Sequence, residues 1–263
     1  MQLNYIDWGI KAYSEALAEQ EEIFDKKVKQ KLQSTSNISQ DFIVCQHPHV
    51  YTLGKHGKIS NLLANPQYLE KINATFHKIN RGGDITYHGP GQIVGYPSLD
   101  IDALGLTLRT YIETIEQSVI DLMEEYSIKC ERLKGATGVW IDANTQKARK
   151  ICAIGVKASR GITMHGFALN INTDLQYFNY INPCGFTDKG VTSLQKELSS
   201  PTLLDVEEIQ KKLFYMIPEK WDKIYLYASI IEDKSKKEKG EMFFYYFPKW
   251  RYHGRVHSLL LDN

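Results

Sequence analysis

Residues 81–92 read Arg81-Gly-Gly-Asp-Ile-Thr-Tyr-His-Gly-Pro-Gly-Gln92, a run that combines backbone freedom with polar side chains. Its four glycines and one proline let the main chain bend sharply and come close to a ligand, because glycine tolerates positive φ and carries no Cβ. Arg81, Thr86, Tyr87 and His88 stand between the glycines, and an apolar strand pattern follows directly. The run therefore predicts a pocket whose surface is partly backbone. A plain hairpin connection is the alternative.

The run matches neither of the common glycine-rich phosphate loops, GxGxxG and GxxxxGK[ST], so the sequence does not indicate nucleotide binding. Three segments further along favour a functional site over a hairpin. They are Arg149-Lys-Ile-Cys-Ala-Ile-Gly-Val-Lys157, His165-Gly-Phe-Ala-Leu-Asn170 and Asn182-Pro-Cys-Gly185.

Together with His47-Pro-His-Val-Tyr-Thr-Leu-Gly54, these segments resemble the lipoyl/octanoyl transferase family. The similarity continues to about Leu194 in the family's order, which is well over half of the chain. It implies an α/β (α+β) fold, with a mixed, largely antiparallel sheet flanked by helices, as in biotin and lipoate ligases. It also implies transfer of an octanoyl or lipoyl group from acyl carrier protein to a lysine of a lipoyl domain, through a thioester on the enzyme's own cysteine.

The resemblance assigns site residues position by position. The acyl-accepting cysteine falls on Cys184, and the lysine that acts with it as general acid and base falls on Lys150. His49 stands where the family often has a second proline. The substrate-binding residues fall on three segments: Arg81, Gly82, Gly83, Asp84, Ile85, Thr86, Tyr87, His88, Ala153, Ile154, Gly155, Gly166, Phe167 and Ala168.

The chemistry of a thioester donor explains why a cysteine and a lysine are needed. A thiolate can both accept an acyl group and release it, whereas a serine ester reacts less readily with an amine. A free cysteine has a pKa of about 8.5, so a nearby cation such as Lys150 would raise the reactive fraction. Lys147 and Lys157 are the nearby alternatives, and Lys147 belongs to a polar turn.

The rest of the predicted site comes from glycine turns and apolar walls. Main-chain amides at Gly83, Gly155 or Gly185 are candidates to stabilise the oxyanion. We expect Tyr87, Ile154 and Phe167 to form walls around the acyl chain. We expect His88 and His165 to shape the pocket.

Three other functions remain open at the level of sequence. In a cysteine–histidine thioesterase, one of the two histidines would be the base and water the acceptor. A catalytically idle binding module would keep the pocket without turnover. An ATP-dependent lipoate ligase would need a longer glycine-rich signature than this chain has.

The composition of the 263 residues is that of an ordinary soluble protein, with 43% hydrophobic and 24% charged residues and a net charge of +1. We expect no nucleic-acid partner, no membrane association, no cofactor and no metal. The chain start lacks the pattern of a secretion signal, so we expect a cytoplasmic protein. We also expect it to be a monomer. Four cysteines without CxxC spacing predict free thiols, of which Cys45 and Cys152 lie in apolar runs. We expect a catalytic domain over residues 1–230 and a C-terminal extension over 231–263.

Hydrophobic periodicity predicts the main elements. Helices are expected over 9–33, 105–126 and 202–216. Strands are expected over 42–45, 50–53, 138–141, 150–156 and 163–171, with the last three antiparallel. An aromatic strand over 242–247 is expected after a charged loop.

The partners implied by the resemblance are octanoyl-acyl carrier protein, the lipoyl domains of 2-oxoacid dehydrogenases and the glycine cleavage H protein. The resemblance implies that the acyl carrier protein and the lipoyl domains are both acidic. We therefore expect a local basic surface to matter more than net charge, and Lys55, His56 and Lys58 are candidates for it.

Overall fold

A mixed sheet of eight strands forms the centre of the computed structural model, which describes residues 3–35, 37–182 and 189–219. Seven strands form one path, and β11 (Gly190–Val191) pairs with β9 at its side. The β1–β2 and β9–β11 pairs are parallel, and the other neighbours are antiparallel, which confirms the predicted fold class. The path runs β1 (Leu3–Ile10), β2 (Gln40–Gln46), β6 (Gln92–Ser98), β10 (Ile162–Asn170), β9 (Arg149–Ser159), β8 (Ala136–Ile141) and β7 (Glu131–Leu133).

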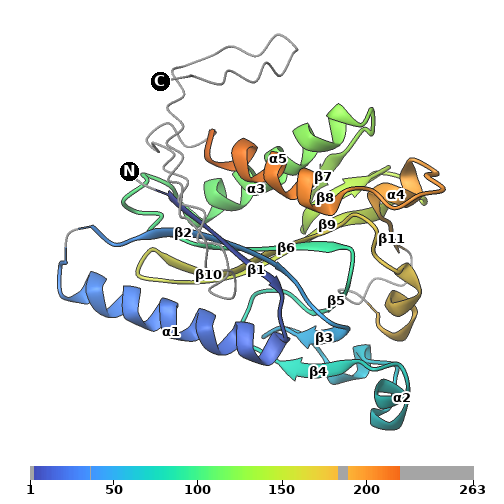
Figure 1. Ribbon diagram of the computed structural model, residues 1–263, viewed down its shortest axis with the longest axis horizontal. Coiled ribbons are helices and arrows are strands. Elements are labelled where there is room, and N and C mark those ends of the chain that lie inside the picture. Colours follow the sequence, from blue (N-terminus) through green and yellow to red (C-terminus); the bar gives the residue numbers. More distant parts are fainter. Residues whose placement is uncertain (1–2, 36, 183–188, 220–263) are drawn as a thin grey trace, which may run out of the picture.

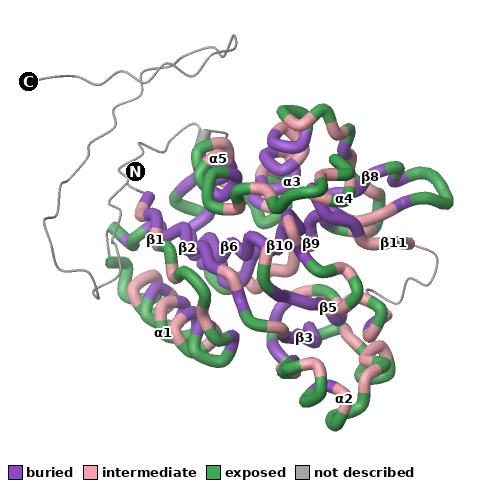
Figure 2. The backbone as a smooth tube through the Cα atoms, turned by 45° about the vertical axis from the view of Figure 1, so that its right-hand side comes forward, coloured by how far each residue is buried: buried purple, intermediate pink, exposed green. Residues whose placement is uncertain are grey.

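Helices cover both faces of this sheet (Figure 1). The helix α1 (Tyr13–Leu32) packs on one face, while α3 (Leu108–Glu125) and α5 (Val206–Glu219) pack on the other. The short helix α4 (Leu194–Glu197) follows β11. Because helices cover both faces, the central strands β6 and β10 are buried along their whole length (Figure 2).

A second, smaller sheet lies beside the first and carries the glycine-rich run. Its order is β4 (Thr75–Lys78), β3 (Val50–Leu53) and β5 (Ile85–His88). It packs with α2 (Pro66–Lys71) and with two 3-10 helices, η1 (Ile59–Asn61) and η2 (Leu175–Tyr180). The middle of the run is therefore strand β5, and its glycines flank that strand.

Most of the elements predicted from periodicity are present. The helices over 9–33, 105–126 and 202–216 are α1, α3 and α5, and the five internal strands are β2, β3, β8, β9 and β10. The last three are antiparallel as expected. The prediction missed β1, β4, β5 and β7. The predicted strand over 242–247 lies outside the described residues. Among the described residues, we find no helix with the length and apolarity needed to cross a bilayer.

The face that α1 buries is more polar than its sequence pattern suggests. Leu17, Ile23 and Val28 are only half-buried, whereas Gln20 and Lys27 are buried. The ammonium of Lys27 donates to the Ser98 carbonyl at 2.5 Å and lies 2.7 Å from the carboxylate of Asp41. Asn4 and Ser39 also donate to that carboxylate. A buried ion pair thus fixes α1 on strands β2 and β6.

We expect Asp41→Ala to lower the free energy of unfolding by about 3–5 kcal/mol, because the buried amino group of Lys27 would lose its ion-pair partner. The double variant Lys27→Met/Asp41→Leu should lose less, since it removes both charges together. Urea denaturation measures the stability of both variants, and Glu22→Ala, a substitution of an exposed residue on the same helix, is the control. A double variant less stable than Asp41→Ala would contradict this account.

Candidate active site

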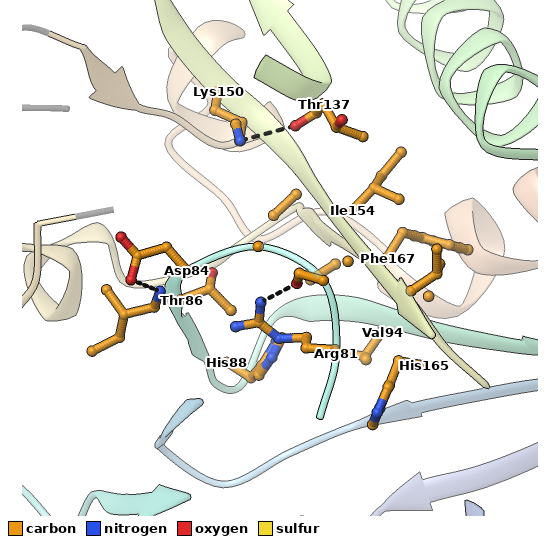
Figure 3. A pocket seen from close by; sticks show the side chains of 18 of the residues that line it. Arg81, Asp84, Thr86, His88, Val94, Thr137, Lys150, Ile154, His165 and Phe167 are labelled. Atoms are coloured by element: carbon orange, nitrogen blue, oxygen red, sulfur yellow. Dashed lines mark hydrogen bonds between the residues drawn. The ribbon is translucent and has the colours of Figure 1, made fainter. Parts of the chain in front are cut away.

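The glycine-rich run closes over a cavity of about 490 Å³ between the two sheets, a size typical of small-molecule sites (Figure 3). Figure 3 shows Lys150 and Thr137 at one end and His165 at the other, with Arg81 and His88 between them. The apolar lining of the cavity comes from several elements and includes Ile85, Val94, Leu108, Ile112, Ile154, Val156, Phe167 and Ala168. The cavity is therefore an apolar slot with a lysine at one end.

The structure brings together most of the residues that the sequence singled out. Lys150 lines the cavity together with thirteen of the fourteen predicted substrate-binding residues: Arg81, Gly82, Gly83, Asp84, Ile85, Thr86, His88, Ala153, Ile154, Gly155, Gly166, Phe167 and Ala168. Three separate segments of sequence thus form one surface.

Tyr87 is the exception, and the expectation that it forms a wall of the acyl slot is wrong. It alternates with Thr86 and His88 on β5 and points to the opposite side of that strand, where it is completely buried. There it stacks on Tyr177, and its hydroxyl lies 2.7 Å from Nδ1 of His49. Tyr87 thus belongs to the aromatic core of the small sheet, and the half-buried His49 contacts it.

Cys184 lies in the segment 183–188, outside the described residues. The described chain on either side of that segment lies at the cavity. Phe178 lines it before the segment, and Val191 lines it afterwards. Val191 is also the strand partner of Lys150 in the β9–β11 pair.

Lys150 is held by its strand and by an aromatic ring. It is the second residue of β9, opposite Trp140 on β8, and a bulge interrupts the β8–β9 pairing at this point. Its ammonium donates to the Thr137 carbonyl at 3.0 Å and lies 4.7 Å from the centre of the Trp140 ring. Bulges commonly redirect a side chain next to an active site, and here the lysine reaches the cavity.

The two charged residues of the glycine-rich run stabilise the run itself. Arg81 is buried, and its guanidinium donates to the Thr52 carbonyl at 2.7 Å and to the Gly82 carbonyl at 2.9 Å. Asp84 accepts from the backbone N–H of Ile85 at 2.7 Å and from the side-chain amide of Asn61. Both side chains therefore shape the loop as well as line the cavity.

The run also depends on close backbone contact with β9. The Gly82 N–H donates to the Val156 carbonyl at 2.9 Å. A Cβ at Gly155 would lie only 2.9 Å from the Gly82 carbonyl oxygen and 3.2 Å from Cδ of Arg81. The glycine at 155 therefore lets the loop lie directly on the strand.

The histidines at the cavity are buried and neutral. Burial lowers the pKa of His88 and of His165 to about 3 each. Nδ1 of His88 donates to the side-chain oxygen of Gln92 at 2.9 Å. Gln92 in turn donates to Asn170 at 2.8 Å, so His88 is part of a polar chain that links β5 to β10.

Several lining residues escaped the sequence analysis. Gln92, Val94 and Tyr96 occupy alternate positions along β6. This spacing of two is the sequence pattern that places all three side chains on one face of the strand. Tyr13, Leu108 and Thr137 come from elements that meet the cavity only through the tertiary fold, and local sequence carries no signal for them.

Comparison with known proteins gives consistent results. A model of the lipoyl protein ligase A/B catalytic domain matches residues 12–215, and an immunity protein YezG-like model matches residues 206–254. An octanoyltransferase of Bacteroides fragilis is 51% identical over 207 residues, which is 79% of this chain and 92% of that protein. An octanoyltransferase of Christiangramia forsetii is 53% identical over 210 residues, covering 78% of this chain and 89% of that protein.

Solved structures show the same fold at low sequence identity. A bipartite lipoate protein ligase from Thermoplasma acidophilum has a TM-score of 0.60 at 13% identity, over 89% of this chain and 87% of that one. A lipoate-protein ligase A bound with ATP has a TM-score of 0.61 at 13% identity, over 89% of each chain. The predicted likeness to lipoate ligases is thus confirmed at the level of fold.

We expect Gly155→Ala to lower the free energy of unfolding by about 1–3 kcal/mol, because the new methyl group overlaps the Gly82 carbonyl. The Gly82 N–H should exchange faster with solvent, since its bond to β9 is strained. Gly190→Ala is the matched control, because a Cβ there meets Cβ of Arg149 at an ordinary 3.4 Å. Equal stability of the two variants would contradict the proposed packing of the loop.

We expect the protein to lose stability as the pH falls from 7 to 5. The buried histidines stay neutral in the native state, whereas in the unfolded chain they take up protons near pH 6.5, so the unfolded state binds more protons in this interval. The loss is at most about 1.4 kcal/mol per pH unit for each histidine. Denaturation curves at both pH values should show a smaller loss for His88→Gln, but an unchanged loss for the exposed control His56→Gln.

Proposed function

The chain belongs to the lipoyl protein ligase A/B catalytic domain family and is an octanoyltransferase, and we propose that it transfers the acyl group through a thioester on Cys184, with Lys150 as general acid and base. The cavity carries this proposal. It joins an apolar slot to Lys150, and its lining includes Phe178 and Val191, which precede and follow the Cys184 segment in the sequence.

The reaction has two steps that balance. In the first, the Cys184 thiolate attacks the carbonyl carbon of the octanoyl thioester, a new C–S bond forms, and the carrier thiol leaves with a proton from Lys150. In the second, the amine of the acceptor lysine attacks the octanoyl-Cys184 carbonyl and gives a proton to Lys150. The C–S bond breaks, the amide forms, and the Cys184 thiolate returns.

Lys150 is suited to this role by its position. Its ammonium is fixed by the Thr137 carbonyl and the Trp140 ring, and apolar residues such as Ile154 lie along the cavity beyond it. A cation beside a cysteine favours the thiolate, and apolar surroundings favour release of the proton from the lysine. One lysine can therefore serve both steps.

The thioesterase alternative receives less support from the histidines. A base with a pKa of about 3, as at His88 and His165, removes a proton from a thiol only weakly. His88 is also engaged with Gln92. An ATP-dependent ligase remains the alternative with the same fold, and dependence of transfer on ATP separates the two.

We further propose that octanoyl-acyl carrier protein is the donor and that lipoyl domains of 2-oxoacid dehydrogenases and the glycine cleavage H protein are acceptors. Lys55, His56 and Lys58 are exposed, and the backbone N–H groups of Lys55 and His56 donate to carbonyls of the glycine-rich run. Acidic partners would thus meet basic side chains next to the cavity. We also propose that residues 1–230 form the catalytic domain and that residues 231–263 form a C-terminal extension.

Incubation with octanoyl-acyl carrier protein should give one octanoyl group per chain, found on Cys184 by intact mass and peptide mapping. Cys184→Ser should give no thioester and lower the transfer rate about a thousandfold or more. Lys150→Met should lower that rate by roughly 10²–10⁴.

The controls are Cys130→Ala, which removes a buried thiol, and Lys147→Met, which removes an exposed lysine. Both should retain normal transfer. Normal transfer by Cys184→Ser would overturn the mechanism, and transfer that requires ATP would place the protein with the ligases.

A further inference from the structure

A second, very small cavity lies behind the acyl slot, between α1 and the large sheet. Its volume is about 10 Å³, and its lining comes from α1, β2, β6 and β10. His165 and Tyr96 line both this cavity and the acyl slot, so the two cavities share these side chains.

Three polar side chains at this cavity have hydrogen-bonding atoms for which no hydrogen bond of good geometry is found among the described residues. They are both amide atoms of Gln20, the hydroxyl of Ser98 and Nδ1 of His165, and all three residues are at least nine-tenths buried. The Gln20 amide nonetheless lies near the Tyr96 hydroxyl and partly offsets the rise that burial causes in the pKa of Tyr96. The three residues come from three different elements and line one cavity. Buried polar atoms are nearly always hydrogen-bonded, so their convergence indicates a shared partner.

The size and chemistry of the cavity identify that partner. A volume near 10 Å³ corresponds to about one water-sized probe, and a buried water commonly makes about three hydrogen bonds. The other lining residues are Ile23, Ile43, Met164 and Tyr96, so none of the described residues around it carries a formal charge. The site therefore favours a small neutral molecule over an ion.

His165 shows a further anomaly at the same place. Its φ is +60°, a left-handed conformation that a residue with a side chain seldom adopts inside a strand. Such strained residues persist when their surroundings hold them firmly, and they gather at functional sites. A hydrogen bond to Nδ1 is one means of holding the ring.

We propose that this cavity binds a single water molecule, which hydrogen-bonds to Gln20, Ser98 and His165 and fixes the orientation of the imidazole at the acyl slot. The water lies on the Nδ1 side of the ring, and its hydrogen bonds to Gln20 and Ser98 bias it toward either donating to Nδ1 or accepting from it, which shifts the tautomer ratio of the imidazole. Gln20 and Ser98 are then positioning residues that act through the water on His165. The proposal does not depend on the thioester mechanism.

The test uses the full chain and two readouts other than activity. Oxygen-17 magnetic relaxation dispersion counts long-lived internal waters, and nitrogen-15 spectra of the His165 ring report its tautomer. The double variant Gln20→Met/Ser98→Ala should lose one long-lived water and shift the tautomer ratio of His165. The matched control is Ser14→Ala/Gln30→Met on the same helix, neither of which lines the cavity, and it should change neither readout.

A high-resolution crystal structure of the unaltered protein gives an independent answer if the double variant does not fold. Density for one water within hydrogen-bonding distance of all three residues supports the proposal. An empty cavity, or an equal water count in the double variant and its control, overturns it. None of these outcomes depends on acyl transfer, so they are distinguishable from a failure of the proposed function.

Discussion

The site depends on close contact between the backbones of β9, β10 and the glycine-rich run. Glycines make this contact possible because they have no side chains. Gly155 on β9 stands opposite Gly166 on β10, and a Cβ at Gly166 would lie 2.1 Å from the Gly95 carbonyl oxygen. The glycine-rich run then lies directly on this region through the bond from Gly82 to Val156. Because no side chains fill this space, the two sheets can enclose a slot, and a larger residue at any of these points would displace a wall of it.

The same constraint explains which features could be predicted from the sequence. The glycine-rich run is a local signal that points to Arg81, whereas Gly155 and Phe167 are implied by the resemblance of whole segments to a known family. Strand β5 shows what the sequence does not reveal. Its side chains alternate, so that Tyr87 lies in the core and His88 lies at the cavity, but the surrounding glycines obscure this strand pattern. Tyr13 and Thr137 reach the cavity only through tertiary packing, which no local pattern encodes.

The helix α1 shows a second limit. Its sequence predicts an amphipathic helix, and the helix is present, but the buried face includes Gln20 and Lys27. A polar residue in a helix is normally taken as exposed, because an unpaired polar group in the core is costly. For Lys27 the required partners, Asp41 and the Ser98 carbonyl, come from strands that lie further along the chain. The pattern of the helix alone therefore does not predict these contacts, because they form only when the strands pack against it.

The chemistry of the proposed transfer fits a site that combines a fixed lysine with neutral histidines. Exchange of one thioester for another is nearly balanced in free energy, and conversion to an amide is favourable, so the enzyme needs proton transfer rather than activation by a nucleotide. Arg81 already contributes one permanent positive charge to the cavity lining, and charged histidines would add to it and oppose protonation of the lysine. Burial lowers the pKa of His88 and of His165, so in the proposed mechanism the histidines stay uncharged and Lys150 exchanges the proton in both steps. The depth of the histidines and the position of the lysine are thus two parts of one electrostatic arrangement.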